Sequence, residues 1–215
     1  MTDVAAVELR SCWRCGADAT IGLVCSRCEA PQALPSDVDL FRILGLPRGL
    51  VIDAGDLERR YHEASRAVHP DRHQTSDAKA RDLSLAAGAA VNRAYRTLRD
   101  PIAVGRYWLE LHGERLGNDN KVPPALAALV FETQETLEEL RDAGGTGPLR
   151  ERVGTIRGEL ASRVASLQVD LTSQYAEWTA ANPSAPAVIT EMKRRLSEIA
   201  YLRTLLGDVD EALGD

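Results

Sequence analysis

Four cysteines near the start of the chain form two Cys-x-x-Cys pairs, separated by nine residues. They are Cys12, Cys15, Cys25 and Cys28. Each pair can present two thiolates from one tight turn, and two pairs complete the tetrahedral sulfur shell that zinc prefers. Zinc is the leading candidate, although four sulfurs also accept iron or an iron–sulfur cluster. Because four thiolates leave no open coordination position, we expect a structural metal site.

Two other uses of these cysteines are open at this point. A redox dithiol is one, but it needs only a single Cys-x-x-Cys pair. A zinc ribbon that binds nucleic acid is the other, since Arg14 and Arg27 flank the pairs. Residues 1–35, however, carry three arginines against four acidic residues, which disfavours nucleic acid as a partner. In so short a module the metal is expected to replace a hydrophobic core. The sequence leaves open which metal is bound and whether two copies pair as a homodimer through this module.

A second set of reactive side chains is His69-Pro70-Asp71, in the stretch VHPDRH. Proline and aspartate are also favoured in ordinary polar turns, so the tripeptide alone does not assign a function. His69 has the chemistry of a general base, but no serine or cysteine partner is indicated nearby. We therefore predict no catalytic residue in this chain.

The segments around this tripeptide are predicted to be helical. Ser36 or Asp37 is expected to cap a short helix, and Asp53 to cap a longer one that stops before Pro70. The apolar stripe of that longer helix is Leu57, Tyr61, Ala64 and Val68. Further helices are predicted over 78–98, with its inner stripe at Leu83, Ala87, Ala90, Ala94 and Leu98, and over 101–112.

The rest of the chain reads as three amphipathic helices, over 123–141, 149–181 and 187–213. The breaks AGGTGP and NPSAP join them, and short turns between apolar stripes favour an antiparallel bundle. The predicted fold is therefore all-α, with a small metal-binding module at residues 1–35. A helical hairpin at 36–112 and a three-helix bundle at 120–215 follow it.

Composition narrows the class of protein. Of 215 residues, 44% are hydrophobic and 27% charged, which is enough apolar material for a packed core. Aromatic residues make up only 5%, which disfavours a β-sandwich. The net charge of −6 gives no overall attraction to nucleic acid. No apolar run approaches the ~20 residues that span a bilayer, and the first residues do not resemble a signal peptide. We expect a cytoplasmic protein that binds no membrane.

Residues 38–101 resemble a J-domain, the module that stimulates ATP hydrolysis by DnaK-type heat-shock chaperones. The matching positions are Tyr61, His69, Pro70, Asp71, Asn92, Ala94, Tyr95, Leu98 and Pro101. The continuation RDPIAVGRYWLELHG, an acidic helix ending ETLEEL and two further helices resemble HscB, the J-type co-chaperone family of iron–sulfur cluster biogenesis. The cysteine module resembles the N-terminal extension of some HscB members. The resemblance covers essentially the whole chain.

The resemblance implies that the protein stimulates the ATPase of a DnaK/HscA-class chaperone, with His69 and Asp71 contacting that partner. Charged residues of the preceding helix share one exposed face, which can steer the protein to an acidic surface; a merely solvated face is the alternative. The predicted chaperone-binding set is Arg59, His62, Arg66, His69, Pro70, Asp71 and Arg72. His62 and Glu63 stand where general J-domains have a Lys-Arg pair, which fits a dedicated partner.

A candidate client surface lies on helix 123–141. Its core stripe is expected to be Leu126, Val130, Thr133, Leu137 and Leu140, and an aromatic and three acids run beside it. A solvated acidic flank is the alternative. The resemblance implies that such a patch binds an iron–sulfur scaffold protein of the IscU type; a J-protein with another client is the runner-up. The predicted client-binding set is Val130, Phe131, Gln134, Glu135, Glu138, Asp142 and Tyr201. Gln134 stands where the family usually has an apolar residue.

Overall fold

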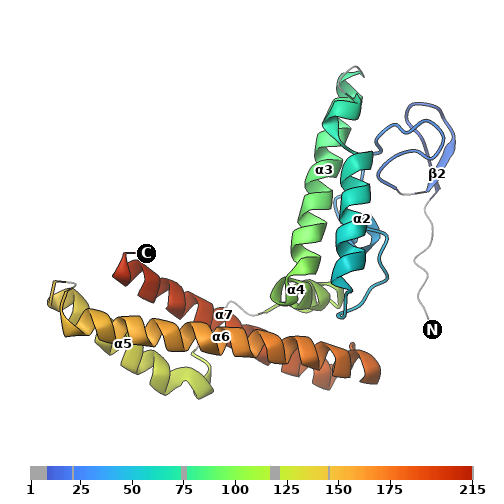
Figure 1. Ribbon diagram of the computed structural model, residues 1–215. Coiled ribbons are helices and arrows are strands. Elements are labelled where there is room, and N and C mark those ends of the chain that lie inside the picture. Colours follow the sequence, from blue (N-terminus) through green and yellow to red (C-terminus); the bar gives the residue numbers. More distant parts are fainter. Residues whose placement is uncertain (1–8, 21, 74–76, 117–121, 145, 215) are drawn as a thin grey trace. The chain divides into compact units, whose positions relative to one another are not determined.

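The computed structural model describes residues 9–20, 22–73, 77–116, 122–144 and 146–214. These contain seven α-helices and one two-stranded antiparallel hairpin, so the predicted all-α class with a small N-terminal module is confirmed (Figure 1). Contacts divide the chain into a unit that ends at Ala103 and a unit that begins at Val104. The predicted ranges 1–35, 36–112 and 120–215 stay a prediction. Among the described helices, none is long and apolar enough to cross a membrane.

The first unit opens with the cysteine module. Its hairpin pairs β1 (Leu9–Ser11) with β2 (Asp18–Thr20), in the register that sets Leu9 opposite Thr20. A second pairing joins Val24 to Pro31 as an isolated antiparallel bridge. Each of these pairings brackets one Cys-x-x-Cys turn, so backbone hydrogen bonds close each turn separately.

A helical hairpin follows, in which α2 (Ala54–Ala67) and α3 (Ala78–Arg99) lie side by side (Figure 1). The short 3-10 helix η1 (Pro70–His73) comes between them. Asp53 and Asp77 cap the two helices by accepting hydrogen bonds from the backbone N–H groups of Asp56 and Ala80. The Asp53 cap was predicted from the sequence. Since no helix can continue through Pro70, the chain turns there.

The contact face of α3 consists mostly of small residues, which lets α2 approach closely. The buried residues of α3 are Ala80, Ser84, Ala87, Val91, Ala94 and Leu98. Three members of the predicted stripe are thus buried, while Leu83 and Ala90 are only half-buried and Ser84 and Val91 take their places. The buried Ser84 hydroxyl donates a hydrogen bond of 2.7 Å to the carbonyl oxygen of Val68, at the end of α2. This bond joins the two helices next to the turn.

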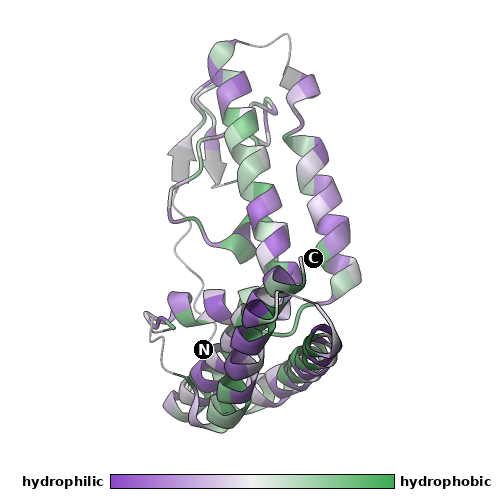
Figure 2. Ribbon diagram, turned by 90° about the vertical axis from the view of Figure 1, so that its left-hand side faces the viewer, coloured by the Kyte–Doolittle hydropathy of each residue, from purple (hydrophilic) through white to green (hydrophobic). Residues whose placement is uncertain are grey.

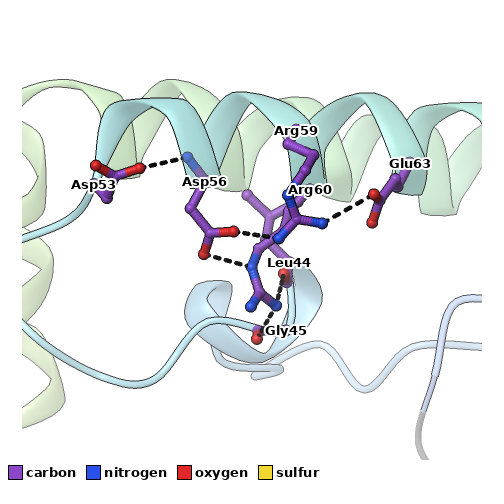
Figure 3. A network of polar contacts seen from close by, with 7 residues as sticks. All are labelled: Leu44, Gly45, Asp53, Asp56, Arg59, Arg60 and Glu63. Atoms are coloured by element: carbon purple, nitrogen blue, oxygen red, sulfur yellow. Dashed lines mark hydrogen bonds and ion pairs between the residues drawn. The ribbon is translucent and has the colours of Figure 1, made fainter.

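The helix α1 (Leu40–Ile43) is anchored to α2 by Arg60 (Figure 3). The Arg60 guanidinium donates to the carbonyl oxygens of Leu44 and Gly45, which follow α1, and pairs with Asp56 at 2.7 Å. The prediction that Ser36 or Asp37 caps α1 was wrong, because the Asp39 carboxylate accepts from the backbone N–H of Phe41. Asp39 also pairs with Arg48, a contact that local sequence could not indicate.

The second unit contains residues 104–111 of α4 (Pro101–Leu111) and three long helices. These are α5 (Ala127–Asp142), which follows the 3-10 helix η2 (Pro124–Leu126), α6 (Pro148–Ala181) and α7 (Pro186–Leu213). Hydrophobic and hydrophilic residues are interspersed along these helices (Figure 2), and many of the buried hydrophobic ones form a cluster to which all three helices contribute. The predicted core stripe of α5 is buried at all five positions: Leu126, Val130, Thr133, Leu137 and Leu140.

Packing of α4 against the C-terminal helices depends on Gly105. A methyl group on its Cα would lie 2.0 Å from the hydroxyl oxygen of Tyr175, whose side chain is fully buried. Beside this contact, the Trp108 indole N–H donates to the carbonyl oxygen of Pro183 at 3.2 Å. The aromatic ring can lie on the helix backbone only because residue 105 has no side chain.

We expect Gly105→Ala to destabilise this unit by about 1–3 kcal/mol, because the buried Tyr175 ring has no room to move away. Denaturant unfolding of the whole protein measures the effect. Gly158→Ala is the matched control: Gly158 is exposed on α6 with no atom near its missing side chain. That change should stabilise by up to about 1 kcal/mol through helix propensity. Equal stabilisation by both variants would contradict this packing.

Candidate functional site

The four cysteine sulfurs converge on one point. Their Sγ atoms all lie within 4.8 Å of one another. The Sγ atoms of Cys12 and Cys28 are 3.7 Å apart, and those of Cys15 and Cys25 are 3.8 Å apart. A tetrahedral zinc centre with metal–sulfur bonds of about 2.3 Å requires neighbouring sulfurs about 3.8 Å apart. The four residues therefore fit a tetrahedral metal, as the spacing predicted.

The surroundings of the sulfurs favour thiolates in part of the cluster only. Burial acts to raise the pKa of Cys12, but the backbone N–H groups of Cys15 and Arg14 outweigh it and bring that pKa to about 6. The backbone N–H groups of Cys28 and Arg27 likewise lower the pKa of Cys25. The pKa of Cys28 is raised to about 12: the N–H of Ala30 lowers it, but burial and the neighbouring thiols outweigh that bond. Four thiolates this close repel one another, and a divalent cation supplies the charge that lets all four ionise.

The two Cys-x-x-Cys turns share one backbone design. The N–H of Cys12 donates to the carbonyl of Ala17 at 2.8 Å, and the N–H of Cys25 donates to the carbonyl of Ala30 at 2.9 Å. Each turn ends on a left-handed residue, Gly16 with φ 69° and Glu29 with φ 56°. Glycine adopts this region freely, whereas a residue with a Cβ does so at a cost. Among the described residues, Glu29 is the only non-glycine with a positive φ.

A side-chain donor outside the two turns also serves the cluster. The side-chain amide of Gln32 donates to the sulfur of Cys12 at 3.4 Å and to the carbonyl of Ala30 at 2.7 Å. Such bonds hold a sulfur in place and offset its negative charge. Sequence reasoning missed Gln32, because nothing in its spacing from the cysteines marks it as a neighbour of the metal site.

The tripeptide His69-Pro70-Asp71 forms a compact exposed turn between α2 and α3. The backbone N–H of Asp71 donates to Nδ1 of His69 at 3.2 Å, and the N–H of Arg72 donates to the carbonyl of His69 at 3.0 Å. When the imidazole is neutral, its proton therefore lies on Nε2. The side chains of His69 and Asp71 are 56% and 69% exposed, so both present their polar atoms to solvent.

The α2 face beside this turn is exposed, but its charges are partly paired. Arg59 pairs with Asp56 and, at 2.9 Å, with Glu63 on its own helix (Figure 3). The hydrogen bond to Asp56 is the chief cause that raises the pKa of Arg59. His62 lies 3.8 Å from the Glu58 carboxylate, and Arg66 is exposed nearer the turn. Among the predicted basic residues on α2, Arg59 is thus the one whose positive charge is most fully neutralised by carboxylates of the same helix.

Tyr61, which falls on the J-domain pattern, has a packing role. Its ring stacks on Tyr95 with 4.1 Å between ring centres, and its hydroxyl donates to the side-chain oxygen of Asn92 at 3.0 Å. These three residues join α2 to α3. The motif positions around the turn therefore hold the helical hairpin that presents His69 and Asp71.

The cysteine module contacts the segment that follows the turn. Arg72 pairs with Glu29 at 3.0 Å, between the second Cys-x-x-Cys turn and η1. The Lys79 ammonium, in the first turn of α3, lies 4.7 Å from the centre of the Trp13 ring in the first Cys-x-x-Cys turn. Sequence reasoning placed Arg72 on a binding surface but missed both contacts. The one available signal was Glu29 itself, which takes the position that a glycine has in the other turn.

The predicted client surface lies along one side of α5. Phe131 is 70% exposed, and Gln134, Glu135, Glu138 and Asp142 are exposed beyond it. Val130 is 4% exposed and belongs to the bundle core, beneath this surface. Tyr201 of α7 is half-buried and packs against the same core. The structure thus combines an exposed aromatic ring and three carboxylates on one helix.

Comparison with known proteins identifies the family. No protein-family model matches the chain. It is 34% identical over 141 residues to the co-chaperone protein HscB homolog of Bordetella avium, covering 64% of this chain and 83% of that protein. It is 31% identical over 143 residues to the iron–sulfur cluster co-chaperone protein HscB homolog of Arabidopsis thaliana, covering 66% of this chain and 56% of that protein. The chain thus spans little more than half of the plant relative.

The fold also matches that of a solved structure. The crystal structure of human co-chaperone protein HscB matches with a TM-score of 0.72 at 23% identity, over 94% of this chain and 98% of that one. Both sequence relatives are co-chaperones by name, a class that acts on another chaperone and is not itself catalytic. The chain belongs to the HscB family of co-chaperones of iron–sulfur cluster biogenesis. The predicted family and the four-cysteine cluster are confirmed.

Proposed function

We propose that this protein is a J-type co-chaperone that delivers an IscU-type iron–sulfur scaffold protein to a DnaK/HscA-class chaperone and stimulates its ATPase. The observation that carries this proposal is the exposed turn of His69, Pro70 and Asp71 at the end of a rigid helical hairpin. Membership of the HscB family supports it. An ATPase assay with the purified chaperone is the test. Stimulation supports the proposal, and an unchanged rate at saturating co-chaperone contradicts it.

The turn acts by binding and performs no chemistry. In this proposal His69, Pro70 and Asp71 contact the nucleotide-binding domain of the chaperone and favour its hydrolysis-competent state. Stimulation is then a coupling free energy between two proteins, and the reacting groups all belong to the partner. The hydrogen bonds from Asp71 and Arg72 back to His69 keep the turn in one conformation, so little ordering is needed on binding.

Basic side chains next to the turn supply attraction at longer range. Arg66 and Arg72 are exposed on either side of the tripeptide, and His62 and Arg59 extend the surface along α2. Such a surface accelerates association with an acidic partner and loses that effect as salt is added. Since Arg59 is already paired with two carboxylates, we expect Arg66 to contribute more than Arg59 to chaperone binding.

The scaffold protein is proposed to bind the exposed side of α5. In this proposal Phe131 provides an apolar anchor, and the rim consists of Gln134, Glu135, Glu138 and Asp142. Tyr201 of α7, which packs against the same core, completes the binding set. Val130, the neighbour of Phe131 in the chain, is buried in the bundle core. Exposed apolar surface with a polar rim is typical of a protein-interaction site.

We expect Phe131→Ala to weaken scaffold binding by about 10- to 100-fold, because it removes the apolar anchor. Glu138→Ala should weaken it by about two- to five-fold, with a smaller effect at high salt. Pull-down followed by titration with the purified scaffold measures both. Val169→Ala and Glu159→Ala are matched controls, since they remove an exposed apolar and an exposed acidic side chain on α6, outside the surface. Equal losses from variants and controls would contradict this surface.

The cysteine module is proposed to hold a structural zinc ion. The ligands would be Cys12, Cys15, Cys25 and Cys28, and the metal, when bound, would replace the core that the module lacks. The sulfur spacing of 3.7 and 3.8 Å supports a tetrahedral ion. Iron also accepts four thiolates, and metal analysis of the purified protein separates the two.

A further inference from the structure

The cysteine module holds the segment after the His69-Pro70-Asp71 turn at two separate places. The second Cys-x-x-Cys turn supplies Glu29, whose carboxylate pairs with Arg72 of η1 at 3.0 Å. The first Cys-x-x-Cys turn supplies Trp13, whose ring lies beneath Lys79 of α3. Each metal-binding turn therefore contributes one side-chain contact to this segment. The second turn contacts η1, and the first turn contacts the start of α3.

The backbone conformation of Glu29 indicates that its side chain has a structural role. Its φ of 56° is left-handed, and Gly16 occupies the matching position of the other turn with φ 69°. Glycine adopts this conformation without strain, whereas the Cβ of glutamate raises its conformational energy. Glu29 thus occupies a conformation that costs free energy, and its carboxylate binds Arg72, 43 positions further along the chain.

Trp13 is held in place independently of Lys79. Its indole N–H donates to the carbonyl oxygen of Pro31 at 2.7 Å, and Pro31 is buried. The ring thus spans the module between its two Cys-x-x-Cys turns, and its face is available to the Lys79 ammonium. Because both anchors, Glu29 and Trp13, directly adjoin metal ligands, their positions depend on the fold of the metal cluster.

Arg72 connects these contacts of the cysteine module to the tripeptide. Its backbone N–H donates to the carbonyl of His69 and closes the turn. A restraint on the Arg72 side chain therefore also restrains the turn that presents His69 and Asp71. A role for Glu29 in merely masking Arg72 would not account for the second contact, since Lys79 lies outside the predicted chaperone-binding set.

We propose that the cysteine module positions the chaperone-binding turn, with Glu29 and Trp13 as positioning residues, so that metal loading strengthens engagement of the chaperone. This inference rests on the proposed co-chaperone function. The Glu29–Arg72 pair is exposed and Trp13 is half-buried, and contacts of this kind shift an equilibrium by about two- to five-fold. The module therefore tunes the affinity for the chaperone and leaves the maximal stimulated rate unchanged.

The test uses the full-length protein with Glu29→Gly, which removes the carboxylate and suits the left-handed backbone. We expect a two- to five-fold higher half-saturating concentration in the ATPase assay, an unchanged maximal rate and an unchanged metal content. Amide hydrogen exchange of residues 71–73 and 77–80 in the free protein should quicken. Arg14→Gln is the control, since Arg14 is an exposed charge of the module, beside Trp13 in the chain.

Two further arms separate positioning from a merely local effect. In the Arg72→Gln background, Glu29→Gly should add nothing, because its partner is gone. In protein whose metal has been removed by a chelator, exchange in the same segments should already be fast, and Glu29→Gly should again add nothing. Additive effects in either background would overturn the proposal.

The remaining outcomes are equally decisive. Unchanged exchange and affinity in Glu29→Gly would overturn the inference, and a lower half-saturating concentration would show that Glu29 masks Arg72 instead. If the wild-type protein stimulates no chaperone, the proposed function fails. Hydrogen exchange in the free protein still reports whether the module positions the turn, so the two failures are distinguishable.

Discussion

His69→Gln is expected to abolish stimulation of the chaperone ATPase and return the hydrolysis rate to its unstimulated value, a loss of tenfold or more. The imidazole is exposed and lies at the centre of the turn, so its ring is available to the partner. Glutamine offers an acceptor to the Asp71 N–H but has no aromatic ring and no second ring nitrogen. A titration of the chaperone with the variant, followed by steady-state hydrolysis, measures the effect.

The same variant should leave the fold and the client surface unchanged. Because His69 is exposed, its replacement should alter the free energy of unfolding by less than about 0.5 kcal/mol. Scaffold binding should also be unaffected, since α5 belongs to the other unit. His62→Gln is a matched control that makes the same substitution on the exposed face of α2, with an expected loss of two- to three-fold at most. Full stimulation by His69→Gln would remove the basis of the proposed function.

Removal of the metal is expected to unfold the cysteine module while the helices persist. The hydrophobic cluster of the module consists of Cys12 and Cys25, with Cys28 packed against it. A cluster of ligands is stable only with its cation, and structural zinc contributes apparent binding free energies of about 10–16 kcal/mol in small zinc peptides. Far-ultraviolet circular dichroism should therefore change little after chelation, whereas amide protection at Cys25 should be lost.

A substitution gives the same test without a chelator. Cys12→Ser with Cys28→Ser should abolish metal binding and expose the module to proteolysis between its two Cys-x-x-Cys pairs. Ser26→Ala, at an exposed position inside the second turn, should retain one metal per chain and resist the protease. Retained protection at Cys25 in the metal-free protein would show that the module has a core of its own.

The long helices could be predicted closely because their periodicity and breakers are unambiguous. The prediction of 149–181 compares with α6 at Pro148–Ala181, and that of 187–213 with α7 at Pro186–Leu213. Proline begins both helices, where its fixed φ suits the first turn. The four-cysteine cluster was equally predictable, since the spacing of the pairs alone indicates one shared metal.

Features that depend on tertiary contacts could not be predicted. The alanine-rich α3 offered several stripes of similar apolarity, so Leu83 was preferred over Ser84, whose hydroxyl finds the Val68 carbonyl only in the folded hairpin. The pairing of Arg72 with Glu29 joins two exposed side chains from distant parts of the sequence. Charge type alone does not identify such partners.

The most direct test of the proposed function is single-turnover ATP hydrolysis by the cognate DnaK/HscA-class chaperone, with this protein and the scaffold added separately and together. We expect the protein alone to raise the hydrolysis rate constant. Protein and scaffold together should raise it further than the two separate effects combined, because one molecule binds both partners. A rate constant that stays at the chaperone's own value in every mixture, and is the same for wild type and His69→Gln, would contradict the co-chaperone function.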